Sequence, residues 1–401
     1  MDKKVKFAAL LLPLALLAGA CSSSSKAATT TASATTTTTA SAATTTAAPG
    51  PTTTAAADPA AAGIAAAKTK ADAALVAPTK IGPTIPLTGK PTKKTVAWLE
   101  CELPSCAQIS KGFKNATAAL GWDLKVISVK SADPSPGFQQ AIDANVNFIA
   151  LSGTPGAVVQ AQIDAAKAKG IGFFSCYSSD VPKGKDNNLY TQCGDNTSVF
   201  GAGALLADWI IADSAGKAHT LMVNIPDFPV LVAESDGAQA EYKANCPGCK
   251  FDELKMTLND LISGAVPGAV VSKLQKDPSI NYVHFSFSDI PAGVADAIEK
   301  AGLLSKVKLT GVDFNATIGL AEIVAGRHQA WSANAKEYSG WLMVDAMARL
   351  SLGMDNPEER TNANLFSYLV TDAATAKALI PTDGWTGPKD MEAQFKALWK
   401  V

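Results

Sequence analysis

The fold of this chain is decided by the segment that begins Thr95-Val96-Ala97-Trp98-Leu99 and ends at Tyr177. Three further apolar runs follow the first, at 124–129, 148–151 and 171–175. Between the runs lie segments with the period of an amphipathic helix, and the first of these carries one apolar face made of Ile109, Phe113, Ala116 and Leu120. Strands that do not alternate polar and apolar residues, separated by helices, are typical of a parallel sheet covered on both faces.

The loops that follow these strands are the first candidates for function. Crossovers between parallel strands are right-handed, so the carboxyl ends of all strands meet at one edge of the sheet. Ligands bind along that edge in open α/β sheets. We therefore expect functional residues in the loops 100–106, 152–155 and 176–180.

The N-terminus predicts export. Three lysines precede an apolar stretch, 7–20, that is too short to span a bilayer. The end of this stretch, Leu17-Ala18-Gly19-Ala20-Cys21, is typical of a lipoprotein signal peptide (1–21), in which Cys21 becomes the lipidated first residue. Ala18 stands where leucine is usual, and the alternative is an ordinary cleaved signal with a chance cysteine.

Residues 22–91 are predicted to be a tether. From 27 to 59 the chain is almost entirely Ala, Thr, Ser and Pro, and such a sequence cannot bury enough apolar surface to offset the loss of chain entropy. We expect this tether to be disordered, with partial helix in the Ala-rich part at 60–75. The tether either holds an anchored domain at a distance from the membrane, or it is a low-complexity tail whose length has not been under selection.

The remaining chain is large enough for two lobes. The first set of strands ends near 192–196, after which the alternation of strand and helix restarts. Strands are predicted at 219–223, 251–256, 282–285, 307–311 and 328–332, and helices at 200–212, 230–243, 265–276, 290–301, 317–325 and 338–352. Two consecutive α/β sets predict paired lobes, with the ligand site at their interface.

Several stretches between 94 and 352 stand in a characteristic order and spacing: Lys94–Leu99 followed by Ser110-Lys111-Gly112-Phe113-Lys114, Phe138–Ile142 ahead of Val146–Ala150, the residues Ala165, Lys167, Gly170 and Ile171, the turn Asp195-Asn196, and Leu309-Thr310-Gly311-Val312-Asp313-Phe314. In this order and spacing the chain resembles the type I periplasmic substrate-binding proteins of the ribose-binding type, the solute receptors of ABC importers.

The resemblance implies an α/β fold of two lobes, each a parallel sheet flanked by helices, that close by hinge bending around a ligand. The chain would cross between the lobes three times, near Asp195, Asn334 and Asn362. The N-terminal lobe would comprise 94–195 plus 336–361, and the C-terminal lobe 196–334 plus 363–401.

Sugar-binding members of this family grip hydroxyls with an Asp–Arg pair after the fourth strand, a second Arg, and stacked aromatic rings. Here Tyr177 and Ser178 follow the fourth strand, Ser105 and Cys106 stand at the stacking positions, and the first arginine is Arg327. Without those guanidinium groups an anion fits poorly. We therefore expect a neutral ligand, sugar-like or partly aromatic and apolar.

The predicted ligand-binding set combines the surviving family positions with polar and aromatic residues at the same edge: Tyr177, Ser178, Asp313, Asn334, Glu100, Glu102, Ser105, Phe228, Phe287 and Phe314. Several have structural alternatives. The two rings Phe287 and Phe314 could belong to the core, Asp313 could cap the following helix, and the two glutamates could be solvated loop charges. Trp331 lies in a strand and is assigned to the core.

The cysteines are predicted to form disulfides. Apart from Cys21, six remain, in local pairs: Cys101 with Cys106, Cys176 with Cys193, and Cys246 with Cys249. Exported proteins keep such pairs oxidised. A zinc site would need a second close pair of ligands, and a thioredoxin-type site would need the Cys246 pair at the start of a helix.

Other function classes are disfavoured by the sequence. No nucleophile elbow, phosphate-binding loop or zinc-protease motif occurs, so we expect no enzyme, no cofactor and no metal site. A net charge of −1 without a basic patch argues against nucleic-acid binding, and the three histidines lie in or beside strands. We expect a monomeric, lipid-anchored, extracytoplasmic receptor that hands a small molecule to an ABC permease. The alternatives are a lipoprotein that presents its closed form to a sensor and a structural envelope lipoprotein.

Overall fold

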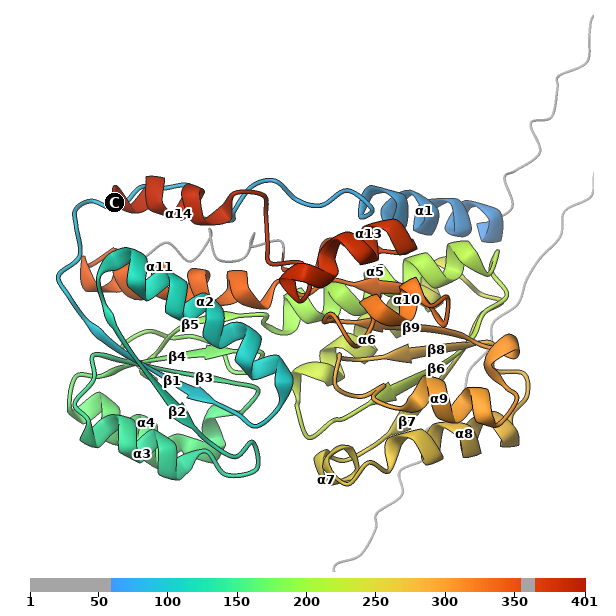
Figure 1. Cartoon of the computed structure of the whole chain (residues 1–401), viewed down its shortest axis with the longest axis horizontal. Coiled ribbons are helices and arrows are strands. Elements are labelled where there is room, and N and C mark those ends of the chain that lie inside the picture. The colour runs from blue at the N-terminus through green and yellow to red at the C-terminus, as the bar shows by residue number, and fades with distance from the viewer. Residues whose placement is uncertain (1–58, 355–364) are drawn as a thin grey trace, which may run out of the picture. The chain divides into compact units, whose positions relative to one another are not determined.

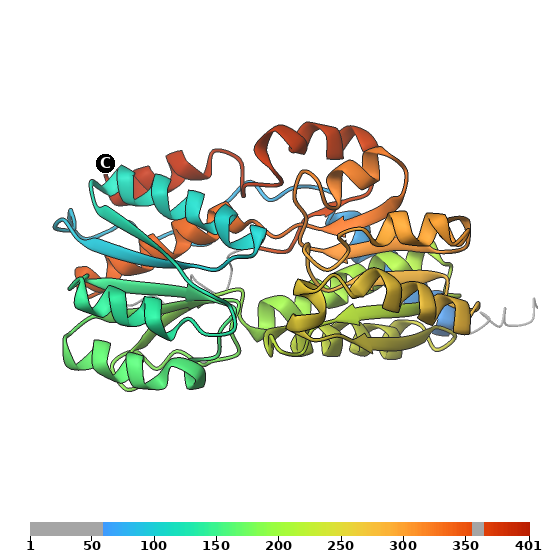
Figure 2. The same ribbon diagram turned by 60° about the horizontal axis from the view of Figure 1, so that its bottom comes forward.

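The computed structural model describes residues 59–354 and 365–401. The signal peptide, Cys21, the first part of the tether and the crossing near Asn362 lie outside these residues. Two parallel sheets lie side by side, each between helices (Figures 1 and 2). The elements before the second sheet are α1 (Pro59–Ala73), β1 (Thr95–Glu100), α2 (Pro104–Leu120), β2 (Asp123–Ser128), α3 (Ser135–Asp143), β3 (Phe148–Ser152), α4 (Gln160–Ala168), β4 (Gly172–Cys176), β5 (Leu189–Cys193) and α5 (Asn196–Asp213).

The second set of elements continues from there to the C-terminus. It comprises β6 (His219–Asn224), α6 (Val230–Asn245), β7 (Lys250–Lys255), α7 (Leu258–Ile262), α8 (Val266–Lys276), β8 (Tyr282–Phe285), α9 (Val294–Lys300), β9 (Lys308–Val312), α10 (Leu320–Val324), β10 (His328–Ser332), α11 (Lys336–Ser351), β11 (Leu369–Val370), α13 (Ala373–Leu379) and α14 (Met391–Trp399).

The first sheet has the strand order β2-β1-β3-β4-β5 and is parallel throughout. Strand β1, which lies between β2 and β3, shows why the sequence does not alternate. Val96 and Trp98 pack into the core shared with α2 and α11, where Trp98 stacks on Phe113 at 4.9 Å between ring centroids. The other face, with Ala97 and Leu99, packs into the core shared with α3 and α4. Both faces are therefore buried, as predicted for a parallel sheet.

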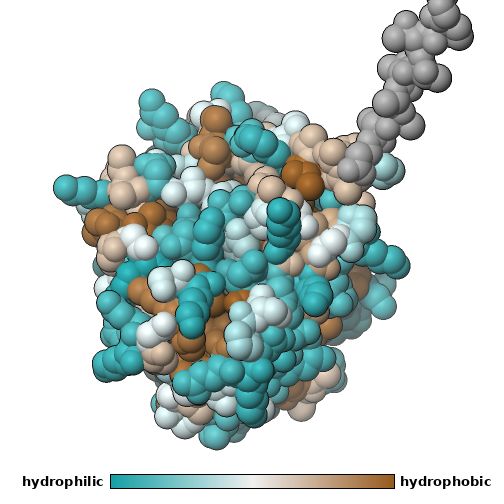
Figure 3. Space-filling model, turned by 90° about the vertical axis from the view of Figure 1, so that its right-hand side faces the viewer, coloured by the Kyte–Doolittle hydropathy of each residue, from teal (hydrophilic) through white to brown (hydrophobic). Residues whose placement is uncertain are grey.

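The second sheet has the order β11-β10-β9-β8-β6-β7. Its strands are parallel except for β11, which pairs antiparallel with β10. Helix α5 packs against α6 and the sheet, while α8 and α9 lie on the opposite side (Figure 1). The outer end of this lobe is mostly hydrophilic, with only small separate hydrophobic areas (Figure 3), because its apolar side chains face inward.

The chain crosses from the first lobe to the second after β5. It returns after β10 to form α11, which packs on α2 and β5 of the first lobe, and it crosses again to form β11 in the second sheet. Asp195 marks the first passage by capping α5, accepting a hydrogen bond from the backbone N–H of Ser198 at 2.9 Å. The prediction that 363–401 lies wholly in the C-terminal lobe is wrong at its end. Helix α14 returns to the first lobe, where Trp399 stacks on Trp341 of α11 at 5.3 Å.

The helix expected at 60–75 is present as α1, but the prediction that 59–91 belongs to a disordered tether is wrong, because this part packs on both lobes. Helix α1 packs on α5 and α6; its Gly63 lies so close to α6 that a Cβ there would be 2.4 Å from the Asn245 carbonyl oxygen. After α1 the chain runs across both lobes. Leu369 N donates to Ala74 O (2.7 Å), and Leu87 N donates to Leu398 O (2.9 Å). Small residues let α1 approach closely, so it gains packing that its weak amphipathic pattern does not indicate.

No helix among residues 59–354 and 365–401 has the length and apolar character needed to cross a bilayer.

Candidate ligand-binding cleft

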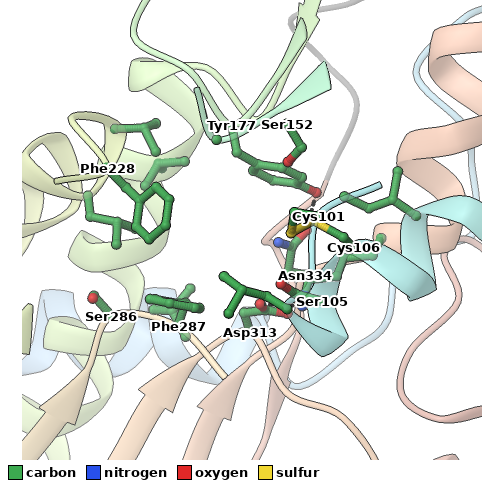
Figure 4. A pocket seen from close by; sticks show the side chains of 18 of the residues that line it. Cys101, Ser105, Cys106, Ser152, Tyr177, Phe228, Ser286, Phe287, Asp313 and Asn334 are labelled. Atoms are coloured by element: carbon green, nitrogen blue, oxygen red, sulfur yellow. Dashed lines mark hydrogen bonds and ion pairs between the residues drawn. A yellow bond between two sulfur atoms is a disulfide. The ribbon is translucent and has the colours of Figure 1, made fainter. Parts of the chain in front are cut away.

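A cleft of about 100 Å³ lies where the carboxyl ends of both sets of strands face each other. Its walls come from the loop after β1 and the start of α2, the ends of β3 and β4, helices α5 and α6, and the residues after β8, β9 and β10. Figure 4 shows Tyr177 and Ser152 on one side, with Phe287 and Asp313 facing them.

Tyr177 is held in a strained backbone conformation at the end of β4. Its φ is +51°, in the left-handed region that bulky residues rarely adopt. The ring occupies space left open by Gly194, where a Cβ would lie 2.4 Å from it. The hydroxyl lies 2.7 Å from both Asn334 Oδ1 and Ser339 Oγ, so it links the first sheet to the segment after β10. Burial raises the pKa of Tyr177 far above its ordinary value, which keeps the hydroxyl protonated.

The disulfide Cys176–Cys193 fixes the base of this loop. Cys176 is directly before Tyr177, and the Cα atoms of the two cysteines lie 4.5 Å apart at the ends of β4 and β5. The pairs Cys101–Cys106 and Cys246–Cys249 are also bridged, as the sequence predicts. The first of these lies in the cleft wall beside Ser105 (Figure 4).

Asp313 follows β9 and also has a left-handed backbone, with φ +66°. Its carboxylate is 3% exposed; Oδ2 lies 2.5 Å from Lys336 Nζ and accepts from Ser288 Oγ at 3.2 Å. Burial raises the pKa of Asp313 to about 6, against the opposing effect of Lys336. The helix-cap alternative is wrong, because α10 has no side-chain cap and the preceding turn is held by Asn315.

Glu234 and Lys336 were not predicted from the sequence, yet both line the cleft. Glu234 on α6 is 1% exposed; its Oε1 lies 3.1 Å from His284 Nε2, and its Oε2 has no partner within the described residues. Burial raises the pKa of Glu234 and lowers that of His284 to about 3. Glu234 is buried because α5 and α6 touch at Gly203, where a Cβ would lie 2.1 Å from the Glu234 carbonyl oxygen.

The rest of the cleft wall is mainly apolar. Phe228 and Phe287 form an edge-to-face pair with centroids 5.9 Å apart, and Phe366 meets Tyr177 in the same manner at 6.2 Å. Aliphatic side chains fill the space between the rings: Leu103, Ile109, Val199, Val230, Leu231 and Val312. A bound molecule would therefore meet polar groups at the strand ends of both sheets and on α6, with apolar groups between them.

The structure brings together six of the predicted ligand-binding residues in this cleft: Tyr177, Asp313, Asn334, Ser105, Phe228 and Phe287. Four others lie outside its lining. Ser178 donates to Asp180 Oδ2 at 2.6 Å, because the turn at Tyr177 directs the next residue into the loop beyond. Phe314 is 2% exposed and borders a second groove, which shares Asn334 and Lys336 with the cleft.

Glu100 and Glu102 border a different groove, next to β2 and the start of α3. Strand β1 neighbours the edge strand β2, so the loop after it also opens to the outside of the sheet. Glu102 Oε2 accepts there from the backbone N–H of Ser131 at 2.8 Å.

Trp331 is fully buried, and its indole N–H donates to His328 Nδ1 at 3.0 Å, as expected of a core residue. Within the described residues one group could hold a metal ion: His219, Asp252 and Asp277. It lies near the amino end of β6, away from the cleft, and its atoms already have partners. Lys273 Nζ donates to Asp252 Oδ2 at 3.0 Å, and His219 Nδ1 lies 2.8 Å from Ser279 Oγ.

The chain is similar to a known family over most of its length. A sequence model of the periplasmic binding protein domain matches residues 104–355. No curated protein sequence matches the chain.

Solved structures with the same fold include the sugar-binding protein of a sugar ABC transporter from Bacillus halodurans (17% identity, TM-score 0.59, 71% of this chain and 99% of that one). A carbohydrate transporter protein from Acidothermus cellulolyticus 11B in complex with myo-inositol is 23% identical (TM-score 0.57, 72% and 98%). A 5-methylthioribose transporter solute-binding protein from Thermotoga lettingae TMO is 18% identical (TM-score 0.60, 79% and 99%). At these identities the likeness shows the two-lobed fold.

Proposed function

The chain belongs to the periplasmic binding proteins, and from that membership we propose that it is the solute receptor of an ABC importer, anchored outside the cytoplasm by a lipid on Cys21. Its ligand is a small molecule, sugar-like or partly aromatic, taken up between the two lobes. The observation that carries the proposal is the cleft itself, in which Tyr177 of the first lobe meets Asn334 at 2.7 Å opposite the buried carboxylate of Asp313.

The polar and apolar halves of the cleft support receptor function over catalysis. Asp313 is already paired with Lys336, and Glu234 with His284. The groups that remain, hydrogen-bonding atoms and ring faces, are those that hold a molecule in one orientation.

A thermal-shift screen of the purified exported protein tests the proposal. Sugars, polyols such as myo-inositol, aromatic compounds and amines are compared, and a ligand at a hundred times its dissociation constant should stabilise the protein by about 2.7 kcal/mol. Cells without this chain should then lose uptake of that ligand. If uptake is unchanged and only a transcriptional response to the ligand disappears, the protein is a sensor component instead.

The anchor is tested separately. Cys21→Ala should release the protein from the membrane fraction or leave its signal peptide uncleaved. Unchanged lipid labelling of this variant would exclude Cys21 as the attachment site. Cys21→Ser, whose side chain is close to cysteine in size, is a second variant for the same test.

A further inference from the structure

The cleft has an excess of buried acidic groups. Glu234 and Asp313 both line it, and Asp289, which is 6% exposed, acts electrostatically on Asp313. Lys336 is the one lysine, arginine or histidine among the described lining residues, and its Nζ is committed to Asp313 at 2.5 Å. Two buried carboxyl groups thus line the cleft together with a single ammonium group, and a third lies close behind Asp313.

Several acceptor atoms in this region have no donor within the described part of the chain. On residues that line the cleft they are Glu234 Oε2, Asp313 Oδ1 and Ser286 Oγ. Buried polar atoms are nearly always hydrogen-bonded in folded proteins. In a binding cleft, donors supplied by the ligand are the partners that these atoms lack.

The charge of the site distinguishes between classes of donor. A carboxylate or phosphate ligand would bring negative charge beside Glu234 and Asp313, where no cation among the described lining residues is free to meet it. A neutral polyol would supply donors but no positive charge, so Glu234, whose partner His284 is kept neutral by its lowered pKa, would stay protonated. An ammonium group supplies both N–H donors and the positive charge that favours the ionised form of Glu234.

The apolar part of the cleft wall indicates the chemical character of the rest of the ligand. Phe228, Phe287 and Leu231 lie around the same space as Glu234, so an apolar body can pack against the rings while its charged end reaches the carboxyl groups.

We propose that the cleft binds an organic ammonium ion, a primary amine on a body with an apolar face, whose nitrogen donates to Glu234 and Asp313. This rests on the receptor function proposed above and names the ligand class of the same site. An amino sugar and an arylalkyl amine both have an ammonium group on a body with an apolar face. The pairs of test compounds described below distinguish between these two kinds of ligand.

The protonation of the empty cleft supports the same ligand. Burial raises the pKa values of Glu234 and Asp313, with Asp313 at about 6. The groups that face them are His284 on β8, Asp289 after β8, Lys336 on α11 and Tyr177 after β4. Because a bound ammonium ion favours the ionised carboxylates, binding should release protons and strengthen as the pH rises from 5 to 8.

The test compares matched pairs in which a hydroxyl replaces the amine: 2-phenylethylamine with 2-phenylethanol, cyclohexylamine with cyclohexanol, and glucosamine with glucose. Affinities are measured by calorimetry on the exported protein at several pH values. In any pair that binds, the amine should bind at least about tenfold more tightly, since hydrogen bonds to a charged partner are stronger than neutral ones. Glu234→Gln should remove that preference, while Glu392→Gln on the exposed face of α14 should keep it.

A second experiment identifies the ligand without assuming its chemical structure. The protein is saturated with a small-molecule extract of culture medium, washed, and weighed intact by native mass spectrometry. A bound amine supports the inference. A bound neutral sugar or acid overturns the inference and leaves the receptor function standing. If neither the pairs nor the extract yields a bound molecule, both the inference and the proposed function fail. Should Glu234→Gln fail to fold, Asp313→Asn provides the same comparison.

Discussion

The buried pair between Asp313 and Lys336 offers the sharpest prediction about stability. Both side chains are 4% exposed and their charged atoms lie 2.5 Å apart, so solvent screens them little. Removing one partner of such a pair leaves a buried charge and typically costs about 3–5 kcal/mol. Asp313→Asn is the appropriate change, because asparagine tolerates the φ of +66° at this position, whereas alanine would add backbone strain.

The matching change is Lys336→Met, which keeps the length of the side chain and removes the charge. We expect each single variant to lose about 3 kcal/mol or more of unfolding free energy in urea titrations without ligand. The double variant should lose clearly less than the sum, since no unpaired charge remains. Additive losses in this cycle would show that the two groups are not coupled, which would refute the assignment of Asp313 to a buried ion pair.

Two further changes test the loops around the cleft. Gly194→Ala places a Cβ 2.4 Å from the Tyr177 ring at a φ of +61° and should cost roughly 1–3 kcal/mol and weaken ligand binding; unchanged affinity would mean that the ring does not serve the site. Replacing Cys176 and Cys193 by serine should cost about 3 kcal/mol, measured by thermal unfolding with the reduced wild type as control.

The sheets could be predicted because each central strand is a continuous apolar run between helices. Val96, Trp98, Ala97 and Leu99 fill two separate cores, and that arrangement is directly visible in the sequence. Tyr177 and Asp313 were found for a similar reason, since each immediately follows a strand at the ligand edge.

Glu234 and Lys336 could not be found in that way. Each lies on a helix, where a charged residue normally predicts a solvated face. Glu234 is buried by the close approach of α5 and α6 at Gly203, and Lys336 by its position beneath Asp313 at the start of α11. Such burial depends on tertiary packing, and the glycine in α5 is the one local sign of it.

The direct test of the receptor account is calorimetric titration of the captured ligand against wild type, Phe287→Ala and Phe200→Ala. Phe287 lines the cleft, whereas Phe200 is 40% exposed on α5. The account predicts one molecule bound per chain, with affinity about tenfold to a hundredfold weaker in Phe287→Ala because apolar contact area is lost, and unchanged in Phe200→Ala. Wild-type affinity in Phe287→Ala would contradict it, because the ligand would then bind somewhere other than this cleft.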